Sequence, residues 1–509
     1  MVTTFNFVAS MKLLGSDSDL FSSHEVGCSW FIRRKLVETV CNDLFASSVN
    51  KSLYCKGPFG CGKSTLLSLI GQEFTKRGFI VFKLAAMQVE ENASELLNVL
   101  QEQSKLKTCV LLVDEASVVK YDKGIWYQLF KAPKENKIKN LRILGVGVPT
   151  LESSSVQYSD SKPISYLLMK RDSEDMNEII DFWVNFVVNS RAPPLEPVEL
   201  SRDSIAEICN WVCDYTNGHM YLILSFCHVF FSKPDLRANV ANYVDFFTST
   251  EFFGMMDARR RRCQLNGNTL PLTSYYDYLF ERDRTNFLQS VSILSKLGYL
   301  DETSCKFFSD YVLCCFQNLS HIPLVEKLPD WPECYSVAEK RIIGGLRHMK
   351  ETDFYAQIGH EMFPLAPSVE DSISQRWSFY VIREFNNVFV SPQNRTLSKM
   401  GRVDFLFNGQ GKIAIEVALN GSRQVYVKKL DKFLSADGVY KQWRNSFAIF
   451  NIVTDSMARK DISGIPRKRL KYLFEFNVQT NTLYRGDMVE PLLVPVSSYL
   501  RTPPSPGKK

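Results

Sequence analysis

The sequence has no run of 18 apolar residues, and its first 20 positions lack a basic segment followed by an apolar one. We therefore expect neither a membrane span nor an ordinary signal peptide, and no membrane partner. The 13 cysteines never form a C-x-x-C pair, and none follows Cys334. This pattern shows no zinc framework and argues against a disulfide scaffold in so long a chain. Reduced thiols in an intracellular compartment are expected, with unconventional export left open.

Charge is distributed unevenly along the chain. The net charge is +6, but residues 371–509 contain 22 Lys+Arg and 11 Asp+Glu, whereas the first 370 residues contain 39 and 44. A basic C-terminal third is typical of a domain that binds a polyanion such as DNA, and equally of a solvated basic surface. Together with the loss of cysteine, this shift predicts a domain boundary near position 365.

A glycine-rich segment with the spacing G-x-x-x-x-G-K-[ST] runs from Gly57 to Ser64. It follows the apolar segment Ser52–Cys55 and leads into an amphipathic stretch, Lys63–Arg77, so it stands between a predicted strand and a predicted helix. Such a P-loop binds the phosphates of ATP or GTP through backbone N–H groups, while its lysine contacts the outer phosphates and its serine binds Mg²⁺. The expected nucleotide-binding residues are Gly57, Gly60, Gly62, Lys63, Ser64 and Thr65.

A second element of a nucleotide site is the apolar run Cys109–Val113, which ends in Asp114 and Glu115. We expect Asp114 to hold Mg²⁺ through water and Glu115 to act as the general base for the attacking water. The alternative is an acidic helix cap after a strand. With the P-loop upstream, the pattern predicts a P-loop ATPase.

The surrounding pattern indicates an α/β domain with a parallel sheet and a helical lid. Further buried strands are expected at 79–84, 108–113 and 141–148, and helices at 205–215 and 221–231. Thr150 and the segment Thr216-Asn217-Gly218-His219 are candidate sensors, the latter resembling the sensor region of signal-transduction ATPases. A glycine helix cap explains the latter segment equally well. Arg171 is a candidate arginine finger.

The C-terminal region is predicted to be a second α/β domain. An amphipathic helix around 373–381 precedes strand candidates at 388–390, 402–407 and 412–417, with a hairpin turn at 408–411 between the last two. A helix at 425–434 and a strand at 447–453 follow. Residues 502–509, which are rich in proline and end in lysine, are predicted to be disordered.

Asp404 and Glu416 stand on two of these adjacent strands. Such a pair can share Mg²⁺ in restriction-endonuclease-like folds, where a lysine two residues after the second acid assists hydrolysis of a phosphodiester. That position is Ala418 here, and Lys429 of the next helix is the candidate substitute. The alternative is that both acids are surface residues.

Taken together, the two halves resemble the crinkler effectors and the retrotransposon hot spot proteins over residues 28–453. The matching pieces are Gly57–Thr65, Val110–Ala116, Gly401–Phe405, Ile415–Gly421 and Lys429–Phe433. The chain differs from the family at Leu419, where a basic residue is common, at Ser378, where a glutamate is common, and at Lys429 and Lys432, where histidine and arginine are common. It also lacks the Leu-Phe-Leu-Ala-Lys type header motif.

The resemblance implies an ATPase coupled to a toxin-like, nuclease-like domain that is delivered into another organism's cells and acts in the nucleus. DNA, host nuclear proteins and a second copy of the chain are then the expected partners. Residues Arg467–Lys471 suit a nuclear import signal, a phosphate contact or plain surface, and Arg259–Arg262 are equally ambiguous.

These observations divide the chain into five parts. They are an N-terminal segment at 1–28, a P-loop NTPase with its lid at 29–250, a mostly helical connector at 251–365, a restriction-endonuclease-like domain at 366–495 and a disordered tail at 496–509. The predicted function is ATP hydrolysis that drives or gates Mg²⁺-dependent DNA cleavage. The alternatives are a non-cutting nucleic-acid or host-protein binding module switched by the ATPase, and a signal-transduction ATPase that only oligomerises.

Overall fold

The computed structural model describes most, but not all, of the 509 residues. The described residues are 33–45, 52–85, 89, 93–116, 138, 140–148, 160–162, 166–171, 173–189, 200–233, 235–236, 243–280, 284–300, 307–319, 336–349, 351–354, 369–385, 389–395, 402–408, 412–438, 440, 443–454, 465–486 and 492–494. The chain divides into two compact units, residues 1–240 with 295–299, and residues 241–294 with 300–509.

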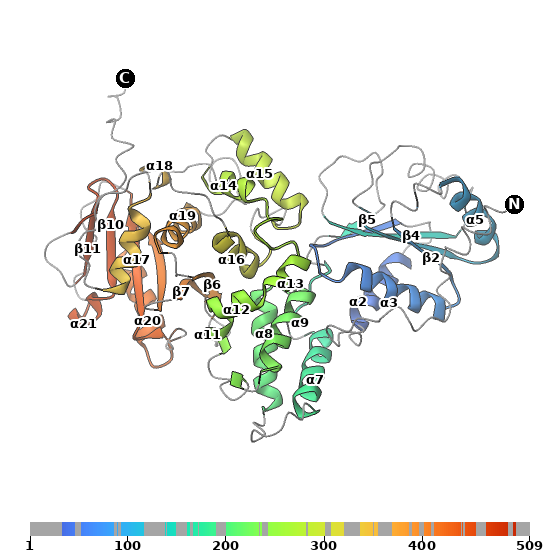
Figure 1. Ribbon diagram of the computed structural model, residues 1–509, viewed down its shortest axis with the longest axis horizontal. Helices are drawn as coiled ribbons and strands as arrows, with labels where there is room; N and C mark the ends of the chain where they lie inside the picture. Colours follow the sequence, from blue (N-terminus) through green and yellow to red (C-terminus); the bar gives the residue numbers. More distant parts are fainter. Residues whose placement is uncertain are drawn as a thin grey trace. The chain divides into compact units, whose positions relative to one another are not determined.

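The first unit is built on a parallel five-stranded sheet with the order β2-β3-β4-β1-β5. Its strands are β1 Ser52–Lys56, β2 Ile80–Ala85, β3 Cys109–Asp114, β4 Leu141–Gly147 and β5 Asp160–Lys162. Its helices are α2 Arg34–Phe45, α3 Lys63–Lys76, α5 Ala93–Leu106, α7 Glu174–Asn189, α8 Arg202–Tyr215 and α9 Met220–Phe231. The expected parallel α/β sheet is therefore present (Figure 1).

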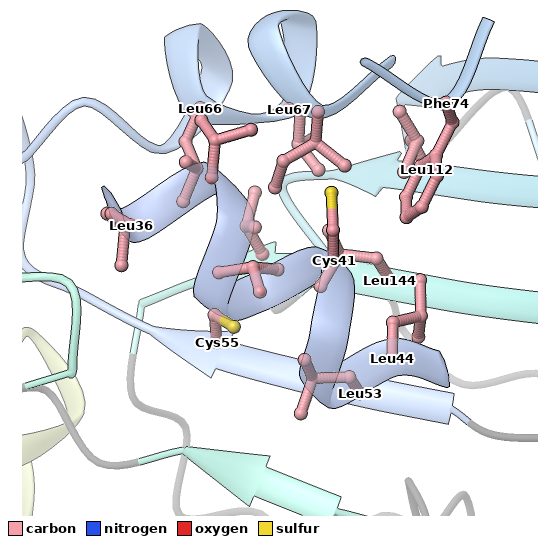
Figure 2. Packing of buried hydrophobic residues seen from close by; sticks show 14 of the residues in the cluster. Leu36, Cys41, Leu44, Leu53, Cys55, Leu66, Leu67, Phe74, Leu112 and Leu144 are labelled. Carbon is pink, nitrogen blue, oxygen red and sulfur yellow. The ribbon is translucent and has the colours of Figure 1, made fainter. Parts of the chain in front are cut away.

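Helices cover both faces of this sheet. Leu36 and Leu44 of α2 and Leu67 of α3 pack on one face, together with side chains of β1, β3 and β4 (Figure 2). Leu96 and Leu100 of α5 pack on the other. Because both faces are covered, the central strands are continuous apolar runs, and every residue of β4 is buried. This burial is why the sequence marks these strands clearly.

Helices α7, α8 and α9 form the lid. Ser201 caps α8, since its hydroxyl accepts a hydrogen bond from the Ser204 N–H. Helix α9 is buried along nearly its whole length, with His219 as its N-cap. The two helices expected at 205–215 and 221–231 correspond to α8 and α9.

Between the lid and the second sheet the described residues are mostly helical. They form α11 Tyr243–Phe247, α12 Thr250–Met255, α13 Asp257–Arg262, α14 Leu272–Phe280, α15 Arg284–Lys296, α16 Asp310–Leu319, α17 Val337–Leu346 and α18 Glu351–Phe354. A single isolated bridge joins Leu300 to Phe307 among them. No described helix is long and apolar enough to span a bilayer.

The second unit contains a mixed seven-stranded sheet in sequential order from β12 to β6. Its elements are α19 Val369–Glu384, β6 Phe389–Arg395, β7 Arg402–Asn408, β8 Ile413–Leu419, α20 Arg423–Leu434, β9 Phe447–Val453, α21 Arg467–Leu470, β10 Leu473–Asn477, β11 Thr482–Arg485 and β12 Leu492–Leu493. Strands β8, β9 and β10 are parallel, and the other pairs are antiparallel. Sequence analysis did not predict β10, β11 or β12.

This sheet is also covered on both faces. Tyr426, Leu430 and Phe433 of α20 pack in a core with Leu406 of β7 and other strand residues. On the other face, Trp377 of α19 contacts the rings of Phe405, Phe407 and Phe450. Along β7, Leu406 therefore turns towards α20, whereas its neighbours Phe405 and Phe407 turn towards α19.

Candidate functional sites

The backbone of the P-loop depends on its glycines. Gly60 and Gly62 have positive φ angles of 77° and 91°, which L-residues with a side chain rarely adopt. A Cβ at Gly57 would lie 2.5 Å from the Cys61 Sγ and 3.0 Å from the Leu167 side chain. The Gly57 N–H donates to the Gly147 carbonyl of β4 at 3.0 Å. The loop is thus tightly folded against the end of the sheet.

Lys63 holds the loop from within. Its ammonium donates to the carbonyls of Gly57 at 3.0 Å and Pro58 at 2.7 Å, and it lies 5.7 Å from the centre of the Phe59 ring. These acceptors are neutral, so phosphate oxygens can replace them without stranding a charge. Ser64 and Thr65, in the first turn of α3, are exposed. The predicted phosphate-binding residues therefore surround the N-terminus of one helix.

The sheet places Asp114 and Glu115 at the same edge as the P-loop. Strands β1 and β3 flank β4, and all three are parallel, so their carboxyl ends coincide. Two strand spacings separate β1 from β3 by roughly 10 Å. The Glu115 N–H donates to the Asp114 Oδ1 at 2.9 Å, and Glu115 is exposed with a φ of 51°. Both residues therefore lie at the carboxyl edge of the sheet, which is also the edge of the P-loop.

Lys83 is a member of this edge that sequence analysis missed. Its ammonium donates to the Ser68 Oγ at 2.6 Å and lies 3.5 Å from the Ser64 carbonyl oxygen. Burial lowers the pKa of Lys83, and the Asp114 carboxylate partly offsets this. A lysine inside the otherwise apolar strand β2 was the available signal.

The candidate sensor segment also contacts the P-loop. The His219 Nε2 is 2.7 Å from the Phe59 carbonyl oxygen, and burial lowers the pKa of His219 to about 4. Arg171, the candidate arginine finger, pairs instead with Asp214 of α8 at 2.7 Å. Thr150 lies outside the described residues.

The C-terminal carboxylates lie together as the strand pattern predicts. The paired register of β7 and β8 ends with Phe405 opposite Ile415, and Asp404 and Glu416 are the next residues of the two strands. The Asp404 Oδ2 accepts the N–H of Val417 at 2.8 Å. Lys429, from α20, places its ammonium 2.8 Å from the Glu416 Oε2 and 3.7 Å from the Asp404 Oδ2.

Glu416 is the buried member of this cluster. Its side chain is 2% exposed, whereas that of Asp404 is 38% exposed. The Glu416 Oε2 faces both Lys429 and Lys432, the second at 3.7 Å, while its Oε1 is buried and has no hydrogen-bond partner among the described residues. From the sequence, Lys432 is marked only as a position where the resembling families commonly have arginine. An orphaned buried carboxylate oxygen is costly unless a further ligand satisfies it.

A buried polar network supports helix α20 beneath these residues. The Asn451 amide donates to the Tyr426 hydroxyl at 2.6 Å and to the Glu475 Oε2 at 3.2 Å, and Tyr426 also donates to Glu475. The Asn451 Oδ1 accepts the Gly421 N–H at 2.8 Å, just before α20. Because Tyr426 is one turn from Lys429, this network orients the helix that delivers Lys429.

Other positions singled out in the sequence have structural partners. Ser378 is buried, donates to the Gln375 carbonyl and accepts from the Gln317 amide. In the arginine run of α13, Arg260 is buried, bonds to Asp257 and lies over the Phe253 ring. Such contacts favour a packing role for that residue. In the second basic run, Arg469 pairs with Asp431, whereas Arg467 and Lys468 are exposed.

The oxygen ligands at both sites fit Mg²⁺. The Ser64 hydroxyl with Asp114 at the P-loop edge, and Asp404 with Glu416 in the second unit, are the oxygen donors that a hard divalent cation prefers. At the second site, the orphaned Glu416 Oε1 is the observation that suits a cation. Among the described residues, no group of three or more His, Cys, Asp and Glu side chains forms a metal cluster. All ten described cysteines are buried and unbridged.

Comparison with known proteins identifies the first unit. Residues 53–131 match the model of the ATPase family associated with various cellular activities (AAA), a span that includes the P-loop and the Asp114-Glu115 pair. The chain therefore contains an ATP-binding P-loop NTPase domain of the AAA type. No curated protein matches the chain.

Solved structures also align with it. The RuvB Holliday junction branch migration motor of Thermotoga maritima is 15% identical over 42% of this chain and 68% of that chain, with a TM-score of 0.27. A katanin self-assembly structure is 14% identical over 39% and 66%, with a TM-score of 0.26. PCH-2 of C. elegans is 13% identical over 40% and 67%, with a TM-score of 0.22. The domain assignment rests on residues 53–131 and not on these alignments.

Proposed function

We propose that the AAA domain hydrolyses ATP with Mg²⁺ and controls a DNA-binding, DNA-cleaving domain in the second unit. For the first activity, the observation that carries the proposal is Lys63, whose ammonium donates to the exchangeable carbonyls of Gly57 and Pro58 at the N-terminus of α3. Lys63 then neutralises the outer phosphates, and Glu115 orients and deprotonates the attacking water. Ser64 and Asp114 would hold Mg²⁺, which would offset part of the phosphate charge.

For the second activity, the supporting observation is the buried, orphaned Glu416 Oε1 beside Asp404 and Lys429. The two carboxylates would hold Mg²⁺, which would polarise a phosphodiester and assist the activation of water. Ala418 stands in β8 where related folds carry a lysine, and it has no ammonium. Lys429 of α20 therefore takes over the stabilisation of negative charge on the phosphate. The surplus of basic residues after position 370 supports DNA as the polyanion.

Plasmid cleavage by the full chain tests both parts. The protein is incubated with supercoiled plasmid and Mg²⁺, with and without ATP, beside Asp404→Ala, Glu416→Ala, Lys63→Ala and the exposed neighbour Lys428→Ala as control. Nicking that is lost in both acid variants and retained in Lys428→Ala supports the nuclease. A change of the ATP response in Lys63→Ala supports control by the AAA domain.

A second candidate function is a non-cutting binding module switched by the ATPase. The observation that favours it is the pair of ammonium groups, Lys429 and Lys432, that already face the Glu416 Oε2. Binding of DNA or a host protein without nicking, together with intact ATP hydrolysis, would establish this function. DNA binding through phosphate contacts should weaken steeply as salt rises.

We further propose that the protein acts as a crinkler-like effector in the nucleus of another organism's cells and associates with copies of itself. The exposed Arg467 and Lys468 support nuclear import. Nuclear accumulation of a fluorescent fusion that fails in an Arg467→Ala/Lys468→Ala variant tests the location. Sedimentation with and without ATP tests self-association.

A further inference from the structure

The contact between the lid and the P-loop has no part in the function proposed above. It joins residues 160 positions apart, His219 at the start of α9 and Phe59 at the tip of the glycine loop. His219 is 1% exposed and Phe59 is half-buried, so the imidazole is shielded from water and its hydrogen bond is partly buried. A buried histidine outside the reacting groups needs an explanation.

The turn before α9 is shaped to deliver this histidine. Asn217 and Gly218 both have positive φ angles, 47° and 76°. The Gly218 carbonyl accepts the Met169 N–H at 2.8 Å, and a Cβ at Gly218 would lie 2.0 Å from the Met169 carbonyl oxygen. Only glycine permits this approach, so the position of His219 is set by close backbone packing.

The hydrogen bonds also assign the tautomer. The His219 Nδ1 accepts the Leu222 N–H at 3.3 Å, which is the N-cap interaction of α9, so the ring proton is on Nε2. The Nε2–H then donates to the Phe59 carbonyl. One neutral ring therefore caps a lid helix and holds the P-loop at the same time.

Two side chains share the carbonyls of the loop. Lys63 binds those of Gly57 and Pro58, and His219 binds that of Phe59. When Lys63 exchanges its carbonyls for phosphate oxygens, the loop loses two of these three restraints. The bond from His219 is then the side-chain restraint that keeps the loop curled around the phosphates.

We propose that His219 is a positioning residue of the ATPase, which holds the P-loop in its phosphate-binding shape through the Phe59 carbonyl and links nucleotide binding to helices α8 and α9. The inference rests on the proposed ATP hydrolysis. It assigns the Thr216–His219 segment a role in addition to that of a helix cap.

Two substitutions separate the roles of the ring. In His219→Asn, the short side chain caps α9 well but does not reach Phe59. In His219→Gln, the longer amide offers an N–H towards Phe59 but is a poor cap. The wild type, both His219 variants and Lys63→Ala are compared as full chains. For each protein we would measure the melting temperature without nucleotide, its rise with Mg²⁺-ATP, and kcat and KM for ATP.

The expected result is a KM about tenfold higher in His219→Asn, the effect of one lost hydrogen bond, with a reduced ATP-induced rise in melting temperature. The melting temperature without nucleotide changes little, and His219→Gln regains most of the wild-type KM. The inference is overturned by two results together. These are a lowered melting temperature in His219→Gln, and a KM and ATP response in His219→Asn equal to those of the wild type. His219 would then act as a helix cap and nothing more. If the wild type and Lys63→Ala respond alike to ATP, the proposed ATPase function itself fails, and the inference fails with it.

Discussion

Lys63 in the first unit and Lys429 in the second both stand where a phosphate is expected, but their partners differ. Among the described residues, Lys63 donates to neutral carbonyls of its own loop, whereas Lys429 faces the carboxylates of Glu416 and Asp404. A lysine held by carbonyls can change partners at small cost. A lysine paired with a buried carboxylate also stabilises the fold, because its removal leaves a buried negative charge uncompensated.

The largest expected effect is therefore on stability at the second site. Lys429→Met leaves Glu416, with its side chain 2% exposed, without its closest cation and should destabilise the second unit by about 3 kcal/mol. Calorimetric unfolding of the full chain measures this loss. Adding Glu416→Gln should restore much of the stability, and Lys428→Met, at the exposed neighbouring residue, should be silent. Equal free energies of unfolding for Lys429→Met and Lys428→Met would show that the two lysines contribute equally to stability.

Lys63→Ala should affect activity and leave stability nearly intact. Loss of the ammonium that stabilises the transferring phosphoryl group should lower ATP turnover by roughly 10²-fold or more. A steady-state ATPase assay measures it, with Lys76→Ala at the exposed end of α3 as control. A turnover within threefold of wild type would remove Lys63 from the site.

His219 introduces a pH dependence into the first unit. Burial lowers its pKa to about 4 from 6.5, so between these values the folded state binds fewer protons than the unfolded state. Stability contributed by the neutral ring is thus present above pH 6.5 and declines as pH falls towards 4, by about 2 kcal/mol at pH 5. As the pH is lowered from 8 to 5, the melting temperature of the wild type should fall further than that of His219→Asn. An equal fall in both proteins would contradict the buried neutral ring.

The smallest effect on stability is expected at Asp404. Its carboxylate is 38% exposed, so Asp404→Asn should change stability by less than about 1 kcal/mol. Mg²⁺-dependent nicking should nevertheless disappear if the pair binds the metal. If Asp404→Asn lost as much stability as Lys429→Met, the different burial of Asp404 and Glu416 would not determine their contributions to stability.

The sequence predicted most elements around both sites because their strands are buried apolar runs. The limits of β3, β4, β7 and β8 differ from the predicted ones by at most two residues. Strand β10 was missed because its sequence, Leu-Phe-Glu-Phe-Asn, contains the buried Glu475, whose partners Tyr426 and Asn451 lie elsewhere in the chain. Helix α2 and the short β5 and β12 were also missed.

The sequence alone located the P-loop, since this motif is contiguous and its glycines, lysine and serine lie within one loop and one helical turn. It also placed Asp404 and Glu416 on neighbouring strands, because strand periodicity and a hairpin determine that spacing. Only the tertiary structure decided how these groups are compensated. The ammonium of Lys429, the orphaned oxygen of Glu416 and the contact of His219 with Phe59 depend on packing between elements distant in sequence, and local patterns do not encode burial or partners at that range.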